Sequence, residues 1–108
     1  MKTRINGVSW TIEAVNTKQM KKERTDGEHL GGLCIPDQKR ILIAEDCVDY
    51  KTVAHELYHA YWAGLYLDDT NEIKLMDIEE IAAAMFADKG EEIVKQAKRV
   101  LKRLEKGK

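Results

Sequence analysis

Hydrophobic positions along this chain alternate with polar ones in the first half and recur every three to four residues in the second. Between residues 8 and 15, apolar side chains at every other position predict a strand with one buried face. Asn6-Gly7, just before it, is a turn signal that joins this strand to a very short lead-in strand. Residues 16–28 are polar and rich in Lys and Arg, and they predict a loop with room for a short helical turn.

Two further apolar runs predict a β-hairpin. Residues 30–35 and 40–44 flank Pro36-Asp37-Gln38-Lys39, where Pro is well placed at the first central position of a turn. Gly31-Gly32 weakens the first run and indicates a bulge or a close backbone approach. In the second run, Ile41 and Ile43 face one side of the strand, and Leu42 and Ala44 face the other.

The second half of the chain predicts three helices. The first spans about residues 49–63, with Asp46 or Asp49 as its N-cap and Gly64 as its end. Residues 77–88 predict a second helix with acidic residues in its first turn, which Lys89-Gly90 ends. Residues 91–105 predict a third, which packs by one apolar stripe: Ile93, Ala97, Val100, Leu101 and Leu104.

These elements predict one α+β domain over residues 1–108. The sheet part covers about residues 4–46, with three or more strands, and the helical part covers about 47–106. The sheet packs on the first helix, and Trp10 and Trp62 are both expected to be largely buried.

Composition and charge exclude few classes of protein. Apolar residues make up 44% and charged residues 34% of the 108 residues, as in an ordinary globular protein, and the net charge is -1. The apolar runs are too short to span a bilayer, and the N-terminus lacks the apolar region of a signal peptide, so no membrane association is expected. Cys34 and Cys47 predict two reduced thiols in a cytoplasmic protein.

The sequence His55-Glu56-Leu57-Tyr58-His59 carries the candidate chemistry. Histidines four apart on a helix project from the same face and can hold one metal ion. Glu56 lies about 100° round the helix from His55, where its carboxylate can reach a water molecule without binding the metal. The rest of the segment 53–63 carries no charge, which predicts a helix that is buried all round, with a metal as partner for the polar side chains.

Two histidines leave a catalytic zinc site incomplete, because such sites usually have three protein ligands. The candidates for the third are Glu79, Glu80 and His29, with Asp77 and Asp88 less favoured. On a helical wheel Glu80 shares its face with Ala83, Ala84 and Ala87, and this small face would let two helices approach closely. That geometry favours Glu80, and it leaves Glu79 as an alternative.

At this point the sequence resembles a known family. His-Glu-Leu-Tyr-His at 55–59, followed by Glu80-x-x-Ala83-x-x-Phe86-Ala87, is similar to the ImmA/IrrE group of metallopeptidases, especially small ones carried by bacteriophages and integrative elements. The resemblance covers residues 5–88. It implies a minimal zincin-like domain of the gluzincin type in the cytoplasm of a bacterial host, with zinc held by His55, His59 and Glu80 and with Glu56 as general base.

The resemblance also implies a reaction, the hydrolysis of a peptide bond in a protein such as a host or phage regulator. In related zinc peptidases the substrate backbone lies along an edge strand, and residues 40–44 are the expected partner here. Tyr50, Tyr66 and His29 are candidate stabilisers of the oxyanion. The chain departs from the family at Asp88-Lys89-Gly90, where a Leu-rich segment ending in Pro is common, and at Ala84, where thermolysin-like enzymes have Asp.

Two other classes of function remain open, as does the oligomeric state. One is a binding module of the same fold that is catalytically weak or inactive, against which the carboxylate of Glu56 argues. The other is a binder of nucleic acid or of an acidic partner through residues 93–108, which contain seven basic residues and one acidic residue. Such a run is typical of the solvated face of an amphipathic helix, so the sequence favours that interpretation over specific nucleic-acid binding.

Overall fold

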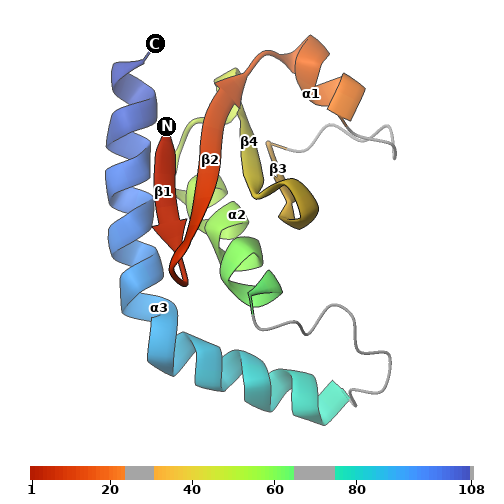
Figure 1. The fold of residues 1–108 in the computed structure, drawn as a ribbon, viewed down its shortest axis with the longest axis vertical. Helices are drawn as coiled ribbons and strands as arrows, with labels where there is room; N and C mark the ends of the chain where they lie inside the picture. Colours follow the sequence, from red (N-terminus) through yellow and green to blue (C-terminus); the bar gives the residue numbers. More distant parts are fainter. Residues whose placement is uncertain (24–30, 65–74, 108) are drawn as a thin grey trace.

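The computed structural model describes residues 1–23, 31–64 and 75–107, which form a four-stranded sheet and three α-helices (Figure 1). The strands are β1 (Lys2–Ile5), β2 (Val8–Val15), β3 (Gly32–Ile35) and β4 (Arg40–Ala44). The helices are α1 (Thr17–Glu23), α2 (Tyr50–Ala63) and α3 (Leu75–Lys106). The predicted α+β class is confirmed.

The sheet is mixed and has the strand order β1-β2-β4-β3. β1 pairs with β2, and β3 with β4, as antiparallel hairpins, whereas β2 and β4 are parallel neighbours. Asn6 and Gly7 have φ angles of 51° and 78°, the left-handed conformations that a type I′ hairpin turn requires. The predicted lead-in strand is therefore present. The turn before β4 forms a short 3₁₀ helix, η1 (Pro36–Gln38).

The short helical turn for which the predicted loop over residues 16–28 left room is present as α1, which covers residues 17–23. The side-chain oxygen of Asn16 accepts a hydrogen bond from the backbone N–H of Gln19 at 2.8 Å, which caps the start of this helix. Met20 is fully buried against the sheet and anchors α1 there. Residues 24–28 lie outside the described part of the chain, as does Leu30 of the predicted hairpin.

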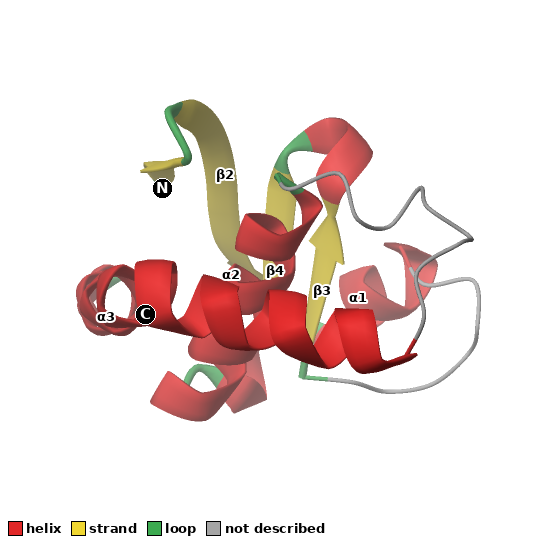
Figure 2. Cartoon of the chain, turned by 90° about the horizontal axis from the view of Figure 1, so that it is seen from below, coloured by secondary structure: helices red, strands yellow, loops and turns green. Residues whose placement is uncertain are grey.

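Each face of the sheet is covered by different helices, as Figure 2 shows from below. Ile41 and Ile43 of β4 belong to the core that α2 and α3 share with β1 and β2. Leu42 and Ala44 lie in a second cluster with Met20 of α1. The predicted division of this strand into two apolar faces is confirmed, and because both faces are covered, all four of these residues are buried.

Asp49, not Asp46, caps α2. Its carboxylate accepts a hydrogen bond of 2.8 Å from the backbone N–H of Thr52, and this bond to the charged form lowers the pKa of Asp49. Asp46 lies in the short 3₁₀ helix η2 (Glu45–Cys47) that precedes α2. Gly64 follows the last residue of α2, as predicted, but keeps a right-handed conformation with φ of -65°.

The predicted end of a helix at Lys89-Gly90 is wrong, because α3 runs without a break from Leu75 to Lys106. Figure 1 shows that α3 changes direction about midway along its length. Gly within a helix costs only about 1 kcal/mol relative to Ala, and the good helix formers on both sides offset that cost. The predicted apolar stripe of the second half is confirmed at Ile93, Ala97, Val100 and Leu104, which are buried, while Leu101 is partly buried against the same core.

The second half of α3 runs alongside β1, where Gln96 joins three elements (Figure 1). Its amide nitrogen donates to the backbone oxygen of Arg4 at 2.6 Å and to the hydroxyl oxygen of Tyr61 in α2 at 3.1 Å. Its amide oxygen accepts from the hydroxyl of Thr3 at 2.8 Å and from Arg99 at 2.9 Å. These bonds fix the position of α3 against the sheet and α2.

Tyr61 is 1% exposed, and burial raises the pKa of its hydroxyl to about 12. In the unfolded chain a Tyr titrates near 10, so the native state holds this proton more tightly. Stability from this group is complete below pH 10 and falls by about 1.4 kcal/mol for each pH unit between about 10 and 12. Urea unfolding at pH 9, 10 and 11 should therefore show a smaller pH dependence for Tyr61→Phe than for the wild type. Parallel curves for the two proteins would contradict this prediction.

No helix in the described part of the chain has the length and apolar character to cross a membrane. Cys34 and Cys47, the two cysteines, form no disulfide bond in the described part of the chain.

Candidate metal and catalytic site

The histidines at positions 55 and 59 come together on one face of α2. Their Nε2 atoms lie 3.2 Å apart, and their rings meet edge to face with a centroid distance of 4.8 Å. Both side chains are exposed, so this pair lies on the solvent side of α2. The helical spacing of four residues therefore produces the convergent pair that the sequence predicted.

The distance between these two nitrogen atoms tests whether zinc fits. Two nitrogen atoms bound to one tetrahedral zinc ion at about 2.0–2.1 Å lie about 3.3–3.4 Å from each other. The 3.2 Å separation of the Nε2 atoms of His55 and His59 is close to this value. It also suits an N–H···N hydrogen bond between one donor and one acceptor tautomer. The pair thus fits zinc with little rearrangement of either ring.

Glu56 has a different environment from its two neighbours. It is only 7% exposed and lies against β3. A Cβ atom on Gly32 would lie 2.6 Å from Cγ of Glu56 and 3.0 Å from Oε2, much too close for a real contact. The glycine at position 32 therefore leaves the space that the Glu56 side chain occupies. The sequence indicated a close approach at Gly31-Gly32 but did not identify Glu56 as the group that approaches.

A cavity of about 200 Å³ opens beside this carboxylate. Gly31 and Gly32 form its β3 side, and Lys51, Thr52, His55 and Glu56 line it from α2. Gly31 is also tightly packed, since a Cβ atom there would lie 3.0 Å from Cβ of Cys47 and 3.3 Å from Cγ2 of Thr52. Sequence reasoning missed Lys51 as a neighbour of the site, although its position one turn before His55 on a helix was the signal.

The expectation that α2 is buried all round is wrong. Val53, Leu57, Ala60 and Tyr61 are buried, but the opposite face of the helix is exposed and carries His55 and His59. Tyr58 is 37% exposed and stacks on Trp62 with a centroid distance of 6.1 Å. Trp10 is buried as predicted, at 3% exposure, whereas Trp62 is only partly buried. Aromatic side chains that shield one another tolerate this partial exposure, so their presence did not indicate burial.

Glu80, the favoured third ligand, is exposed on α3, as is Glu79. Within residues 1–23, 31–64 and 75–107, no group of three or more His, Cys, Asp or Glu side chains is placed to hold a metal ion. The structure therefore brings His55 and His59 together but does not add Glu80 to them. Asp88 is exposed and lines a separate cavity beside Tyr61. His29 and Tyr66 lie outside the described residues, and Tyr50 is exposed at the first position of α2.

The small-residue face around Glu80 does not pack as expected. Ala83, Ala84 and Ala87 are exposed, whereas Met85 is buried in the core shared with α2. Phe86, next to Met85 in the chain, is 75% exposed. The core shared with α2 therefore takes the Met85 side of this helix and not its alanine face.

The strand expected to pair with a substrate is also corrected. β4 lies between β2 and β3, and its backbone is already hydrogen-bonded on both sides. A peptide therefore cannot extend the sheet at residues 40–44. The strand that contacts Glu56 is β3, through Gly32.

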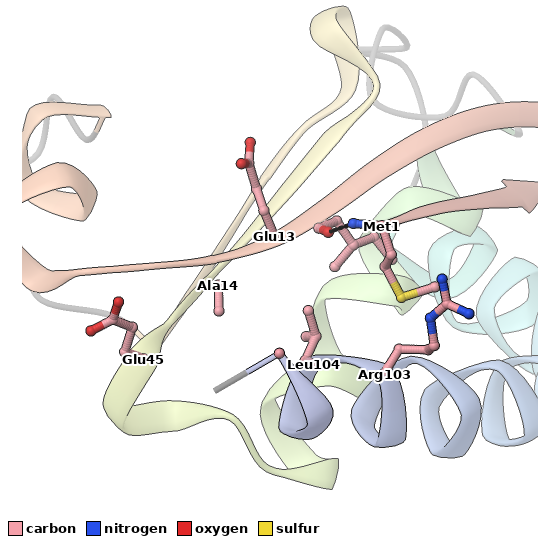
Figure 3. A pocket seen from close by; sticks show the side chains of 8 residues that line it. Met1, Glu13, Ala14, Glu45, Arg103 and Leu104 are labelled. Carbon is pink, nitrogen blue, oxygen red and sulfur yellow. Dashed lines mark hydrogen bonds between the residues drawn. The ribbon is translucent and has the colours of Figure 1, made fainter.

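A larger hollow of about 640 Å³ lies elsewhere on the molecule, between β2 and the end of α3 (Figure 3). The amino group of Met1 donates to the backbone oxygen of Ile12 at 2.7 Å at its edge. Its charged lining consists of Glu13, Glu45 and Arg103. Neither His55 nor His59 lines it, so it is separate from the candidate site.

Comparisons with known proteins assign neither a family nor a function to this chain. No protein-family model matches the chain, and no match is found among curated proteins or among solved structures.

Proposed function

We propose that this chain is a zinc-dependent metallopeptidase of the ImmA/IrrE-like, gluzincin type. The observation that supports this most is the 3.2 Å separation of the Nε2 atoms of His55 and His59, next to the buried carboxylate of Glu56. A site that only held a structural metal would have no use for a carboxylate packed beside its ligands. The proposed substrate is a peptide bond in a protein such as a bacterial or phage regulator, by resemblance to that group.

In this proposal His55 and His59 hold the zinc ion. When bound, zinc lowers the pKa of a coordinated water towards neutrality and polarises a carbonyl group. Glu56 accepts a proton from the attacking water and donates it to the leaving amine. Because Gly32 packs against Cγ, Cδ and Oε2 of Glu56, the carboxylate is restricted in its movement, which favours proton transfer at a fixed position. The resemblance proposes Glu80 as the third ligand, although Glu80 does not lie beside the two histidines among the described residues, and it leaves Glu79 and His29 as alternatives.

The first experiment is to measure the zinc content of the purified protein. The wild type should hold one zinc per chain, and His55→Ala or His59→Ala should reduce this to below about one tenth, because each removes one of the nitrogen ligands. Glu80→Ala should weaken zinc binding markedly if that residue is the third ligand, and Glu79→Ala and His29→Ala test the alternatives. Glu91→Ala, at a well-exposed carboxylate in α3, is the matched control.

A melting curve gives a second, independent measurement. A metal that binds only the native state raises its stability by mass action, so a chelator should lower the melting temperature of the wild type at neutral pH. It should have no effect on His55→Ala. The zinc proposal would be overturned if the purified wild type contained no metal and its melting temperature were the same with and without chelator.

A further inference from the structure

The charges of α3 are divided between its two halves. Residues 75–92 contain six acidic residues and one basic residue, a net charge of -5. Residues 93–107 contain six basic residues and one acidic residue, a net charge of +5. The net charge of -1 for the whole chain therefore conceals a strongly basic segment, which Figure 1 shows at the side of the molecule next to β1.

The basic residues of this segment form one continuous surface. Because successive residues of a helix are about 100° apart, six positions fall in an arc of about 140° opposite the buried stripe. All six are Lys or Arg, and all six are exposed: Lys95, Lys98, Arg99, Lys102, Arg103 and Lys106. We call these six residues the cationic face. The buried stripe of Ile93, Ala97, Val100 and Leu104 fixes its outward direction.

Few acidic groups of the protein neutralise the cationic face. Lys95 pairs with Glu91 at 3.3 Å on the exposed surface, and Arg99 is bound by Thr3 and Gln96. Lys98, Lys102 and Lys106 form no ion pair within the described residues, and they are four residues apart. At a rise of 1.5 Å per residue they form a row with steps of about 6 Å.

We propose that the cationic face binds the phosphate backbone of duplex nucleic acid without sequence preference. The arc contains no apolar residue, whereas protein partners are usually anchored by buried aromatic or aliphatic side chains. A membrane surface would require an available apolar stripe beside the cations, and the stripe of Ile93, Ala97, Val100 and Leu104 in this half of α3 is buried in the core. A convex row of unpaired cations is suited to phosphates, which need charge and not apolar contact. This proposal does not depend on a metal or on peptide hydrolysis.

Fluorescence anisotropy with a labelled DNA duplex of about 20 base pairs and arbitrary sequence tests the proposal. We expect a Kd of about 10⁻⁶ to 10⁻⁴ M, and a slope of log K against log salt of about -4 to -5, as for four to six phosphate contacts. Lys98→Glu, Lys102→Glu and Lys106→Glu together should weaken binding at about 50 mM KCl at least tenfold and make the slope shallower by about 3.

The chain offers a control with the same change of net charge. Lys18, Lys21 and Lys22 are exposed on α1, which lies on the opposite side of the molecule (Figures 1 and 2). Their triple replacement by Glu should weaken binding less than threefold. Circular dichroism checks that each variant is folded, and replacing the α3 lysines by Gln provides a second variant that introduces no new negative charge into the last turn of the helix.

Several outcomes would overturn the proposal. One is an equal loss of DNA affinity in the α1 and α3 variants. Another is no binding of the duplex by the wild type at about 100 μM protein in 50 mM KCl. A third is competition by poly-glutamate that is as strong as competition by unlabelled duplex. The triple α3 variant could also bind DNA as the wild type does but differ from it in the mass measured by sedimentation. That result would overturn the proposal and assign the cationic face to contacts between copies of the chain.

Discussion

Glu56→Gln is expected to remove peptide hydrolysis while leaving the zinc and the fold in place. Gln has the size of Glu and fits the same space beside Gly32, but it cannot accept a proton. Loss of a general base costs on the order of 10² to 10⁴ in rate. A peptide library made from a digested bacterial lysate avoids the need for a known substrate, because mass spectrometry detects every newly formed N-terminus.

The matched control for this experiment is Glu91→Gln, the same chemical change at a carboxylate whose side chain is 84% exposed on α3. It should retain the activity of the wild type. Zinc content must be equal in all three proteins, so that a lost metal is not mistaken for a lost base. If wild type and Glu56→Gln release the same termini at the same rate with zinc bound, Glu56 is not the base. If neither releases any, the binding-module alternative is favoured.

Signals that are local in the sequence predicted local structure well. Asn6-Gly7 predicted a hairpin because few residue pairs tolerate two successive positive φ angles, and both are present. The choice between Asp46 and Asp49 remained open, since both residues can cap a helix. Only the position of the helix start, which gives Asp49 the N–H of Thr52, decided between them.

The placement of elements relative to one another was predicted less well. The wheel placed the face of Ala83, Ala84 and Ala87 against another helix, yet the structure buries Met85 instead and leaves that face exposed. A wheel orders side chains around one helix but does not show which of them the core will take. Similarly, the alternation in β4 was read correctly, but its central place in the sheet depends on parallel pairing with β2, which no local pattern indicates.

The predictions for the candidate site also succeeded within one helix and failed between elements. The spacing of His55 and His59 is a property of one helix and was sufficient to predict that their Nε2 atoms converge. A third ligand from α3 depends on how two helices pack, and that packing was inferred from an alanine face that is in fact exposed. The contact between Glu56 and Gly32 joins residues 24 positions apart on different elements, so only the structure could identify it.

Gly32→Ala is expected to destabilise the protein by about 1–3 kcal/mol, since inserting a methyl group into a filled space forces neighbouring atoms to move. The new Cβ atom would meet Cγ of Glu56 at 2.6 Å, in the middle of that side chain and not at its flexible end. The carboxylate must therefore move, and hydrolysis should fall at least tenfold even if the zinc content is unchanged. Urea unfolding and the peptide-library assay measure the two effects.

A double-mutant cycle shows whether the cost arises from this one contact. In a Glu56→Ala background the side chain ends at Cβ, so the close approach to Cγ is gone and Gly32→Ala should cost much less than in the wild type. Gly90→Ala is the control for a glycine with ordinary contacts, the nearest being 3.4 Å, and in a helix it should raise stability by about 0.5–1 kcal/mol. An equal cost of Gly32→Ala in both backgrounds would mean that the glycine serves the backbone of β3 and not the space around Glu56.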